Sequence, residues 1–279
     1  MPNNDRTIDV IIRFHDASKS ETLLRALFCL YGQSHEAVQP LLMLQDFSPE
    51  AVEAMERLVD RLAWNERRRR PIVHNYIPAA KGDHRSRLIN EGFRAGQGRY
   101  IAILDYDDVV YGHAYEHLIG RLEASDAAIA FGRIAVKHVY PLKHYEFVLS
   151  TTRNTFNGNG LNDLFRDNFC PIHSFVLDRS KIAPEDLYFD ETMTRLEDYD
   201  FLLRTCAKYP SDFEGLERYV GTYYWRVDGS NTVQSYQGPG AEENQRQWQS
   251  ARERIDQLKK TLGIAGGGAP GVKAPVGVA

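Results

Sequence analysis

The chain has 279 residues, which is enough for one large domain or for one domain with a small appendage. Its 43% hydrophobic and 26% charged residues are ordinary for a globular protein, and the net charge of −4 argues against general nucleic-acid binding. No stretch reaches the ~20 apolar residues of a membrane span, and the N-terminus has no apolar signal core. Three scattered cysteines without a Cys-x-x-Cys pair predict reduced thiols. We therefore expect a cytoplasmic protein, with peripheral contact at the inner face of a membrane left open.

The first half of the chain alternates apolar segments with helical patterns. Ser18 and Glu21 fit a capping box ahead of a first helix, and Ser48 opens a second helix that is expected to reach about Trp64. Asp83 is placed to cap a third helix over 84–95. Strands separated by helices imply βαβ units. The pattern predicts an α/β fold, with a Rossmann-like, mostly parallel central sheet flanked by helices and strands at 8–14, 41–44, 71–77, 101–104 and 127–132.

Regularity fades in the second half of the chain. The stretch 137–169 is polar, aromatic and rich in Asn and Gly, which is typical of a substrate loop or an irregular insertion. A helical pattern returns over 200–208, and a long helix is expected from about Gly240. Its narrow apolar seam favours packing against the body over a free coiled coil. We expect a main domain over 1–239, a C-terminal helical extension over 240–264 and a disordered tail over 265–279.

Three carboxylates, Asp105, Asp107 and Asp108, follow directly on the fourth apolar strand. They repel one another unless a positive charge lies between them, and carboxylate oxygens are hard ligands suited to Mg²⁺ or Mn²⁺. Open α/β sheets bind ligands at the carboxyl ends of their strands. The cluster predicts a divalent-metal site that holds a phosphorylated ligand. The alternative is a polar loop in which Asp107 or Asp108 caps the next helix.

A second acidic cluster, Glu197 and Asp198, precedes the apolar turn of the helix expected near 200–208. Acids in a first helical turn gain from the helix dipole, which is a purely structural reason for them. A carboxylate at the mouth of the sheet could instead deprotonate a hydroxyl as a general base. Arg85, just before the acidic strand, has the shape that suits phosphate oxygens, or else it is a solvated helix start. Asp46, after the second strand, points to the same edge or only caps a turn.

Several segments share a characteristic order and spacing. They are 10–16, 45–48, 85–108 with the Asp-Tyr-Asp-Asp run, and the acidic 189–204. Together, over roughly residues 8 to 233, they resemble the family 2 glycosyltransferases, which have the nucleotide-binding GT-A fold. The resemblance implies a hexosyltransferase-like enzyme of polysaccharide biosynthesis. Such an enzyme moves a sugar, with inversion, from a UDP-, dTDP- or GDP-linked donor to a hydroxyl of a saccharide or glycolipid acceptor.

The resemblance also implies roles for individual residues. Asp46 would contact the nucleotide base with His15 near it, Arg85 would lie near the diphosphate, and Asp105 would meet the ribose or the metal. Asp107, with Asp108, would ligate Mn²⁺ or Mg²⁺. Asp198 would activate the acceptor hydroxyl, and Glu197 would position it. Residues 1–133 would form the nucleotide-sugar half and 134–239 the acceptor half.

The chain departs from the family pattern at four places. Arg13, counted here among the nucleotide-sugar-binding residues, stands where the family usually has Pro, and His15 stands where an aromatic residue or Asn is usual. Phe47 replaces the Gly of the Asp-Asp-Gly-Ser segment, and Asp228 is the nearest match to a late metal-ligating His. Asp228 would coordinate the metal or only shape a turn. His173 and Trp225 fall where an acceptor site is expected, with core packing as the alternative.

Two other functions compete with sugar transfer. A nucleotidyltransferase on a similar sheet would want a glycine-rich phosphate loop after the first strand, and residues 13–22 contain no glycine. A non-catalytic saccharide-binding protein could keep the fold without the chemistry. The presence of both acidic clusters argues against that second alternative.

Overall fold

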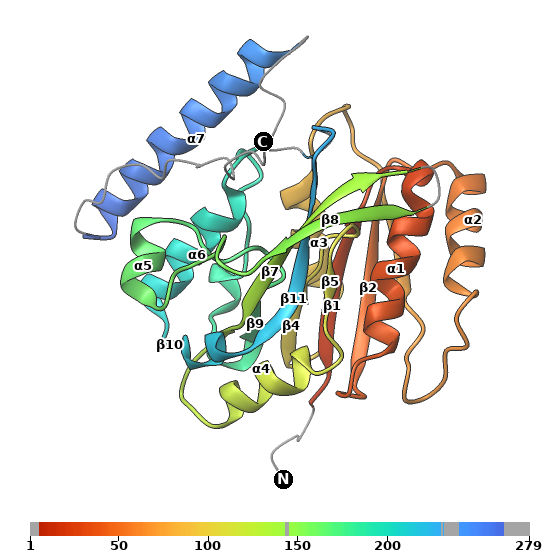
Figure 1. The fold of residues 1–279 in the computed structure, drawn as a ribbon, viewed down its shortest axis with the longest axis horizontal. Coiled ribbons are helices and arrows are strands. Elements are labelled where there is room, and N and C mark those ends of the chain that lie inside the picture. Colours follow the sequence, from red (N-terminus) through yellow and green to blue (C-terminus); the bar gives the residue numbers. More distant parts are fainter. Residues whose placement is uncertain (1–5, 143–144, 230, 232–239, 265–279) are drawn as a thin grey trace.

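The computed structural model describes residues 6–142, 145–229, 231 and 240–264. Its larger sheet has seven strands in the order β10-β6-β9-β4-β1-β2-β3 (Figure 1). The neighbours in this sheet are parallel except at β9, which runs antiparallel to both β4 and β6. The predicted mostly parallel α/β sheet is confirmed. The strands are β1 (Ile8–Phe14), β2 (Val38–Gln45), β3 (Ile72–Tyr76), β4 (Tyr100–Ile103), β6 (Ile129–Phe131), β9 (Phe175–Asp178) and β10 (Ser211–Asp212).

Helices cover both faces of this sheet, because successive side chains of a strand point to opposite faces. Ile12 of β1 packs in one buried cluster with residues of α1 (Ser20–Tyr31), α2 (Pro49–Val59) and α4 (Ala114–Glu123). Ile11 packs in the other cluster, with α3 (Arg85–Ala95), α5 (Leu161–Arg166), α6 (Glu197–Lys208) and α7 (Ala241–Thr261). Short 3-10 helices complete the chain: η1 (Ala17–Lys19), η2 (Arg179–Lys181), η3 (Pro184–Asp186) and η4 (Glu214–Glu217).

A second, four-stranded sheet corrects the expectation of an irregular insertion over 137–169. Its order is β5-β11-β7-β8, and the strands are β5 (Val109–Val110), β7 (Arg133–Pro141), β8 (Glu146–Thr152) and β11 (Tyr219–Arg226). Strands β7 and β8 form an antiparallel hairpin. Its outer strand shows no hydrophobic alternation, because Phe147, Val148 and Leu149 are all exposed. A strand with neither face buried needs no alternation of apolar and polar residues, and that alternation is the pattern from which strands are predicted.

Two helix ends also differ from the expectation. Ser18 does not cap α1; it lies in η1, where its backbone N–H and its hydroxyl both donate to Asp16, at 3.0 and 2.7 Å. The Ser18 N–H, which a capping box would pair with the Glu21 side chain, thus donates to Asp16, and no described side chain caps α1. Helix α2 ends at Val59 rather than near Trp64. Its start is as predicted, because the Ser48 hydroxyl accepts the Ala51 N–H at 3.3 Å.

The helix expected from about Gly240 is α7, drawn in blue beside α6 in Figure 1. Ala251 and Ile255 of its apolar seam are buried in the α3–α6 cluster, which confirms packing against the body. The predicted disordered tail, 265–279, lies outside the described residues. Among the described helices, none combines the length and the apolarity that a bilayer crossing requires. The three cysteines are free thiols, as expected.

Candidate active site

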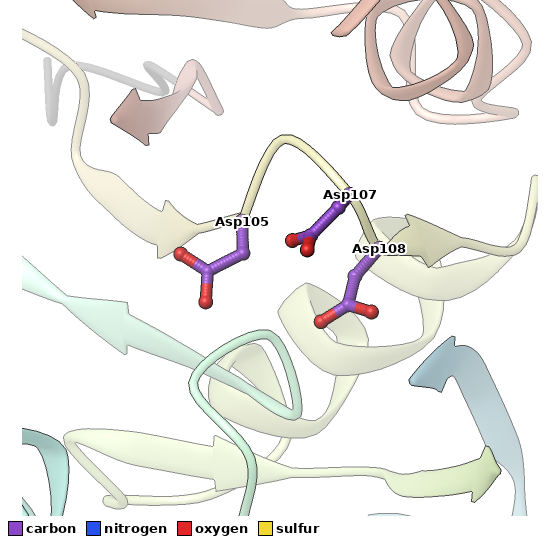
Figure 2. A group of neighbouring side chains, drawn as sticks. All are labelled: Asp105, Asp107 and Asp108. Atoms are coloured by element: carbon purple, nitrogen blue, oxygen red, sulfur yellow. The ribbon is translucent and has the colours of Figure 1, made fainter. Parts of the chain in front are cut away.

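The three carboxylates of the Asp-Tyr-Asp-Asp run lie where β4 ends. All four residues of β4 are buried, and the chain then turns sharply into β5 (Figure 2). Asp105, Asp107 and Asp108 each offer an oxygen, and these oxygens all lie within 4.8 Å of one another. The loop leads into a strand, and the next helix, α4, has His113 at its N-cap position without a side-chain cap. The structural alternative, in which Asp107 or Asp108 caps that helix, is therefore wrong.

Asp105 is paired with Arg13 of β1. The guanidinium of Arg13 donates two hydrogen bonds to the Asp105 carboxylate, at 2.7 and 3.1 Å. Burial raises the pKa of Asp105, but attraction and hydrogen bonding to Arg13 outweigh burial and hold this pKa below its ordinary value. Arg13 is expected from the sequence to contact the nucleotide sugar, although the family usually has Pro at its position. In the structure it fixes the first carboxylate of the loop in its ionised form.

Asp107 and Asp108 have the opposite electrostatic character. Arg226 donates to Asp107 at 2.7 Å, and the backbone N–H of Tyr224 donates to Asp108 at 2.9 Å. Burial and the neighbouring carboxylates nevertheless raise the pKa of Asp107, and they raise that of Asp108 well above its ordinary value. A bound cation would relieve this repulsion. Each carboxylate can accept about four hydrogen bonds or metal contacts, so the trio keeps free oxygen capacity and fits a hard divalent cation.

The second acidic pair opens helix α6. Leu196, just before it, has the left-handed φ of 57°, and this turn sets the direction in which α6 starts. Glu197 accepts from Arg13 at 3.3 Å and lies 3.7 Å from Arg85. Asp198 accepts instead from the Asn168 side chain at 3.3 Å and from the Tyr199 N–H at 2.7 Å. Burial, followed by repulsion from Glu197, raises the pKa of Asp198 to about 6.

One side chain connects the two acidic clusters. Arg13 bonds Asp105 on the loop after β4 and Glu197 at the start of α6, and its charge also acts on Asp198. The two clusters are 89 residues apart or more in the sequence, yet they lie at one edge of the sheet. An arginine shared by two carboxylates is rigid, because each bond restricts the rotamers left to the other. The arrangement sets a cation-binding group beside a proton-accepting group.

The remaining predicted site residues lie at the same edge with fewer contacts. Arg85, at the start of α3, donates to Asp83 and to the Thr194 carbonyl, each at 2.7 Å. His15 and Asp46 follow the paired strands β1 and β2, and both are exposed. Among the described residues, neither forms a hydrogen bond or ion pair with the carboxylate loop. Asp46 has a left-handed φ of 57°, a conformation that Asp adopts more readily than most residues other than Gly.

The two predicted acceptor residues flank Tyr223. His173 is buried, and its ring stacks 6.5 Å from that of Tyr223, whose other neighbour is Trp225 at 6.3 Å. Nδ1 of His173 lies 3.3 Å from Asp108, but without the geometry of a hydrogen bond. Burial lowers the pKa of His173 to about 4, so the ring is neutral at pH 7. Asp228 is exposed in the turn after β11 and is not part of the carboxylate trio.

Four residues of this region were missed by sequence reasoning. Arg25 and Glu146 have no local pattern that marks them, since one lies on an amphipathic helix and the other in a stretch read as irregular. Asn168 lies in the same stretch. Arg226 carries a signal in the sequence, because it directly follows Trp225 and lies two residues before Asp228, in the segment expected to contact the metal. A cation in that segment is suited to the phosphates that such a metal would accompany.

A hollow of about 660 Å³ lies elsewhere, between the end of α3 and residues 184–191. Its lining contains Arg94 and Arg179 but none of the predicted site residues. The chemistry described above is therefore concentrated at a sheet edge, away from this hollow.

Comparison with known proteins identifies the family. The sequence pattern of glycosyl transferase family 2 matches residues 9–182, more than half of the chain. No curated protein sequence matches. Among solved structures, S. aureus TarS 1-349 in complex with UDP-GlcNAc aligns with a TM-score of 0.61 at 11% identity, over 92% of this chain and 71% of that one. The same fragment in complex with UDP gives a TM-score of 0.53 at 11% identity, over 91% and 72%. S. aureus TarS gives 0.56 at 10% identity, over 91% and 43%. At such identities the likeness shows the fold, which is GT-A. The chain belongs to glycosyl transferase family 2 and is a glycosyltransferase.

Proposed function

We propose that this enzyme transfers a sugar from a nucleoside-diphosphate donor to a hydroxyl of a saccharide or lipid-linked glycan, with inversion and with a divalent metal. One observation carries the proposal: Arg13 joins the carboxylate loop to the acidic start of α6. A leaving diphosphate and an attacking hydroxyl need charge stabilisation and a base within one site. Both are provided by residues that lie at one edge of the sheet.

On the donor side, we assign the nucleotide to the carboxyl ends of β1, β2 and β4. Asp46 and His15 are exposed there and are free to meet a base, and Asp105 is held by Arg13 in position for a ribose or a metal. Arg85 is the phosphate-binding cation at the start of α3. The structural neighbour that binds UDP-GlcNAc supports a nucleotide sugar as donor, and UDP, dTDP and GDP donors all fit the chemistry described.

We assign Mn²⁺ or Mg²⁺ to Asp107 and Asp108, with Asp105 as the third candidate ligand. Their oxygens are hard donors, and the raised pKa values of Asp107 and Asp108 mark a place where the neighbouring arginines do not fully offset burial and the repulsion between carboxylates. Bound there, the cation would neutralise charge that builds up on the departing diphosphate. The residues of the chain hold that position ready through Arg13, Arg226 and the Tyr224 backbone.

On the acceptor side, we assign the base to Asp198. With a pKa of about 6 the carboxylate is mostly ionised at pH 7, and it is a stronger base than an ordinary aspartate. Glu197 stays paired with Arg13 and positions the turn that carries Asp198. A hydroxyl deprotonated there attacks the sugar carbon as the diphosphate leaves from the other side, which inverts the anomeric centre. Neutral His173 and the half-buried Trp225 are assigned to acceptor contacts.

We keep the division of the chain into a nucleotide-sugar half, 1–133, an acceptor half, 134–239, the helix 240–264 and the tail 265–279 as a proposal. The three free cysteines fit a reducing compartment, and we place the enzyme in the cytoplasm. Contact with the inner face of a membrane would follow if the acceptor is lipid-linked.

The test is a screen of UDP-, dTDP- and GDP-sugars for release of the nucleoside diphosphate, with Mn²⁺, with Mg²⁺ and with EDTA. We expect one base to be preferred and EDTA to abolish turnover. NMR of the product's anomeric centre then reads the stereochemistry. Turnover that persists in EDTA would remove the metal from the proposal, and retention would remove the single displacement. Saccharide binding without affinity for any nucleotide would favour the non-catalytic alternative.

A further inference from the structure

Three charged side chains from three separate elements meet at Asp107 of the carboxylate loop. Arg226 of β11 donates to Asp107 at 2.7 Å and lies 3.2 Å from Glu146 of β8. Arg25 of α1 donates to the Asp107 carbonyl at 2.6 Å and is also paired with Glu146. Glu146 therefore holds two arginines against the same residue of the loop.

This cluster is more than a surface ion pair. Only 12% of the Arg226 side chain and 14% of the Glu146 side chain are exposed, so both are largely removed from water. The Arg25 guanidinium lies over the Tyr224 ring, 3.9 Å from its centroid, and the buried Nε of Arg25 has no hydrogen-bond partner among the described residues. A buried N–H without an acceptor is costly, and it marks a group that is not yet fully satisfied.

Asp107 and Glu146 are the carboxylates that face Arg226 and Arg25 in this cluster. A divalent cation on Asp107 and Asp108 would raise the positive charge here to four, counting the two arginines, against the three carboxylates Asp107, Asp108 and Glu146. The cation would also compete with Arg226 for the Asp107 oxygens. The surplus then calls for an anion with several oxygens, and the planar guanidinium fork matches phosphate.

We infer that Arg226 and Arg25 bind the diphosphate of the donor, and that Asp107 takes the place of a phosphate oxygen on Arg226 until the donor and the metal arrive. This assignment rests on the proposed function and deepens it. Arg13 contacts the loop at Asp105 and Arg226 contacts it at Asp107, so cations approach the loop at both ends. Glu146 is a positioning residue that keeps the two guanidinium groups aligned. The hairpin β7–β8 thereby becomes part of the donor site.

The test uses inorganic pyrophosphate, which has neither base nor sugar, so that the unknown donor identity does not matter. Binding is measured by calorimetry in Mg²⁺ for the full chain. Arg226→Gln should weaken pyrophosphate binding by about tenfold or more, Arg226→Lys should weaken it less, and Glu146→Gln should fall between wild type and Arg226→Gln. Arg153→Gln is the control, because Arg153 lies over the Tyr219 ring at 5.5 Å, away from the cluster. Arg226→Gln binding within twofold of wild type would overturn the inference.

A second measurement does not depend on how well Arg226→Gln folds. In metal-free buffer, Asp107→Asn should bind pyrophosphate more tightly than wild type, because Arg226 is released. The double variant Asp107→Asn/Arg226→Gln should lose that gain. If the double variant still binds pyrophosphate more tightly than wild type, Asp107 acts only by repelling the anion. That result would overturn the inference that a phosphate oxygen replaces Asp107 on Arg226. If no nucleotide sugar serves as a donor, the proposed function is wrong. The pyrophosphate measurements do not depend on that screen and would still test the roles of Arg226 and Asp107.

Discussion

The carboxylates after β4 and those at the start of α6 lie at one edge of the sheet, but they are neutralised differently. The loop trio is contacted by arginines from β1, α1 and β11, and yet the pKa values of Asp107 and Asp108 are raised. Among the described residues, Asp198 accepts hydrogen bonds from an amide side chain and a backbone N–H, and its pKa is about 6. Its neighbour Glu197 is ion-paired with both Arg13 and Arg85.

The difference shows how one residue type serves two kinds of chemistry. Three negative charges packed within 4.8 Å favour a doubly charged ion over any single proton. A half-buried carboxylate with two neutral donors and a second carboxylate beside it has its pKa raised toward physiological pH, where it can accept a proton. The arginine contacts determine which acid of the second pair can act as a base. Arg13 and Arg85 are both paired with Glu197, so Asp198 is the member with the raised pKa.

The largest effect is expected from Asp198→Asn, which keeps the Asn168 contact but cannot take a proton. Transfer should fall by about 10³-fold, while the affinity for the nucleoside diphosphate stays within about twofold. Single-turnover rates and calorimetry measure the two quantities separately. Asp167→Asn, an exposed carboxylate next to Asn168, serves as the control and should leave transfer unchanged. Wild-type turnover by Asp198→Asn would place the base elsewhere.

Asp107→Asn should break the other half of the comparison. We expect the metal-dependent affinity for UDP, or for the base preferred in the screen, to fall by about 100-fold, equivalent to ~2.7 kcal/mol. The measurement is calorimetry at fixed nucleotide with increasing Mn²⁺. Asp198→Asn is the matched variant and should keep the metal dependence of wild type. Equal metal dependence in both variants would mean that the loop does not hold the cation.

Much of the framework of this site could be predicted from the sequence. The sequence predicts strand β1 over the residues it occupies, because five of its seven residues are strongly apolar. The pattern predicts the Asp-Tyr-Asp-Asp run at the end of a buried strand, where it lies, and it predicts the start of α6 one turn later than the structure has it. These signals are local: an apolar run, its end, and the acids that follow it.

The arginine network could not be predicted in the same way. Glu146 and Arg226 are 80 residues apart and meet only because β8 and β11 flank β7 in one sheet. The outer strand of the hairpin, β8, does not alternate apolar and polar residues as a strand with one buried face does. Its register therefore could not be predicted from the sequence. Contacts that depend on the pairing of distant strands leave no trace in the local pattern of either strand.

The pH dependence of transfer sharpens the contrast between the two clusters. A group with a pKa of about 6 is ionised above that pH, and so kcat/KM should be flat above about 7 and fall tenfold per pH unit well below 6. At pH 5 about a tenth of the plateau should remain. The residual activity of Asp198→Asn should lack this acidic limb between pH 5 and 7. A wild-type profile that is flat down to pH 5 would contradict the assignment of the base.

The smallest expected effect is on stability, and its sign differs between the clusters. The folded pKa of Asp198, about 6, lies above its ordinary 3.8, so keeping this group ionised costs stability above pH 6, and the cost disappears as the pH falls toward 3.8. Because Asp198 is only half-buried, we expect Asp198→Asn to stabilise the fold by about 1 kcal/mol at pH 7.5.

Asp105 has a lowered pKa, so its contribution to stability is favourable above its ordinary pKa and is lost as the pH falls below that value. Asp105→Asn should therefore destabilise the fold at pH 7.5, because Arg13 loses its partner. Urea unfolding at pH 7.5 and 4.5 measures both differences. The Asp198→Asn difference should shrink at pH 4.5, whereas the Asp105→Asn difference should persist there, because pH 4.5 still lies above the ordinary pKa of an aspartate, 3.8. Destabilisation by Asp198→Asn at pH 7.5 would mean that the carboxylate is a structural acceptor and not a poised base.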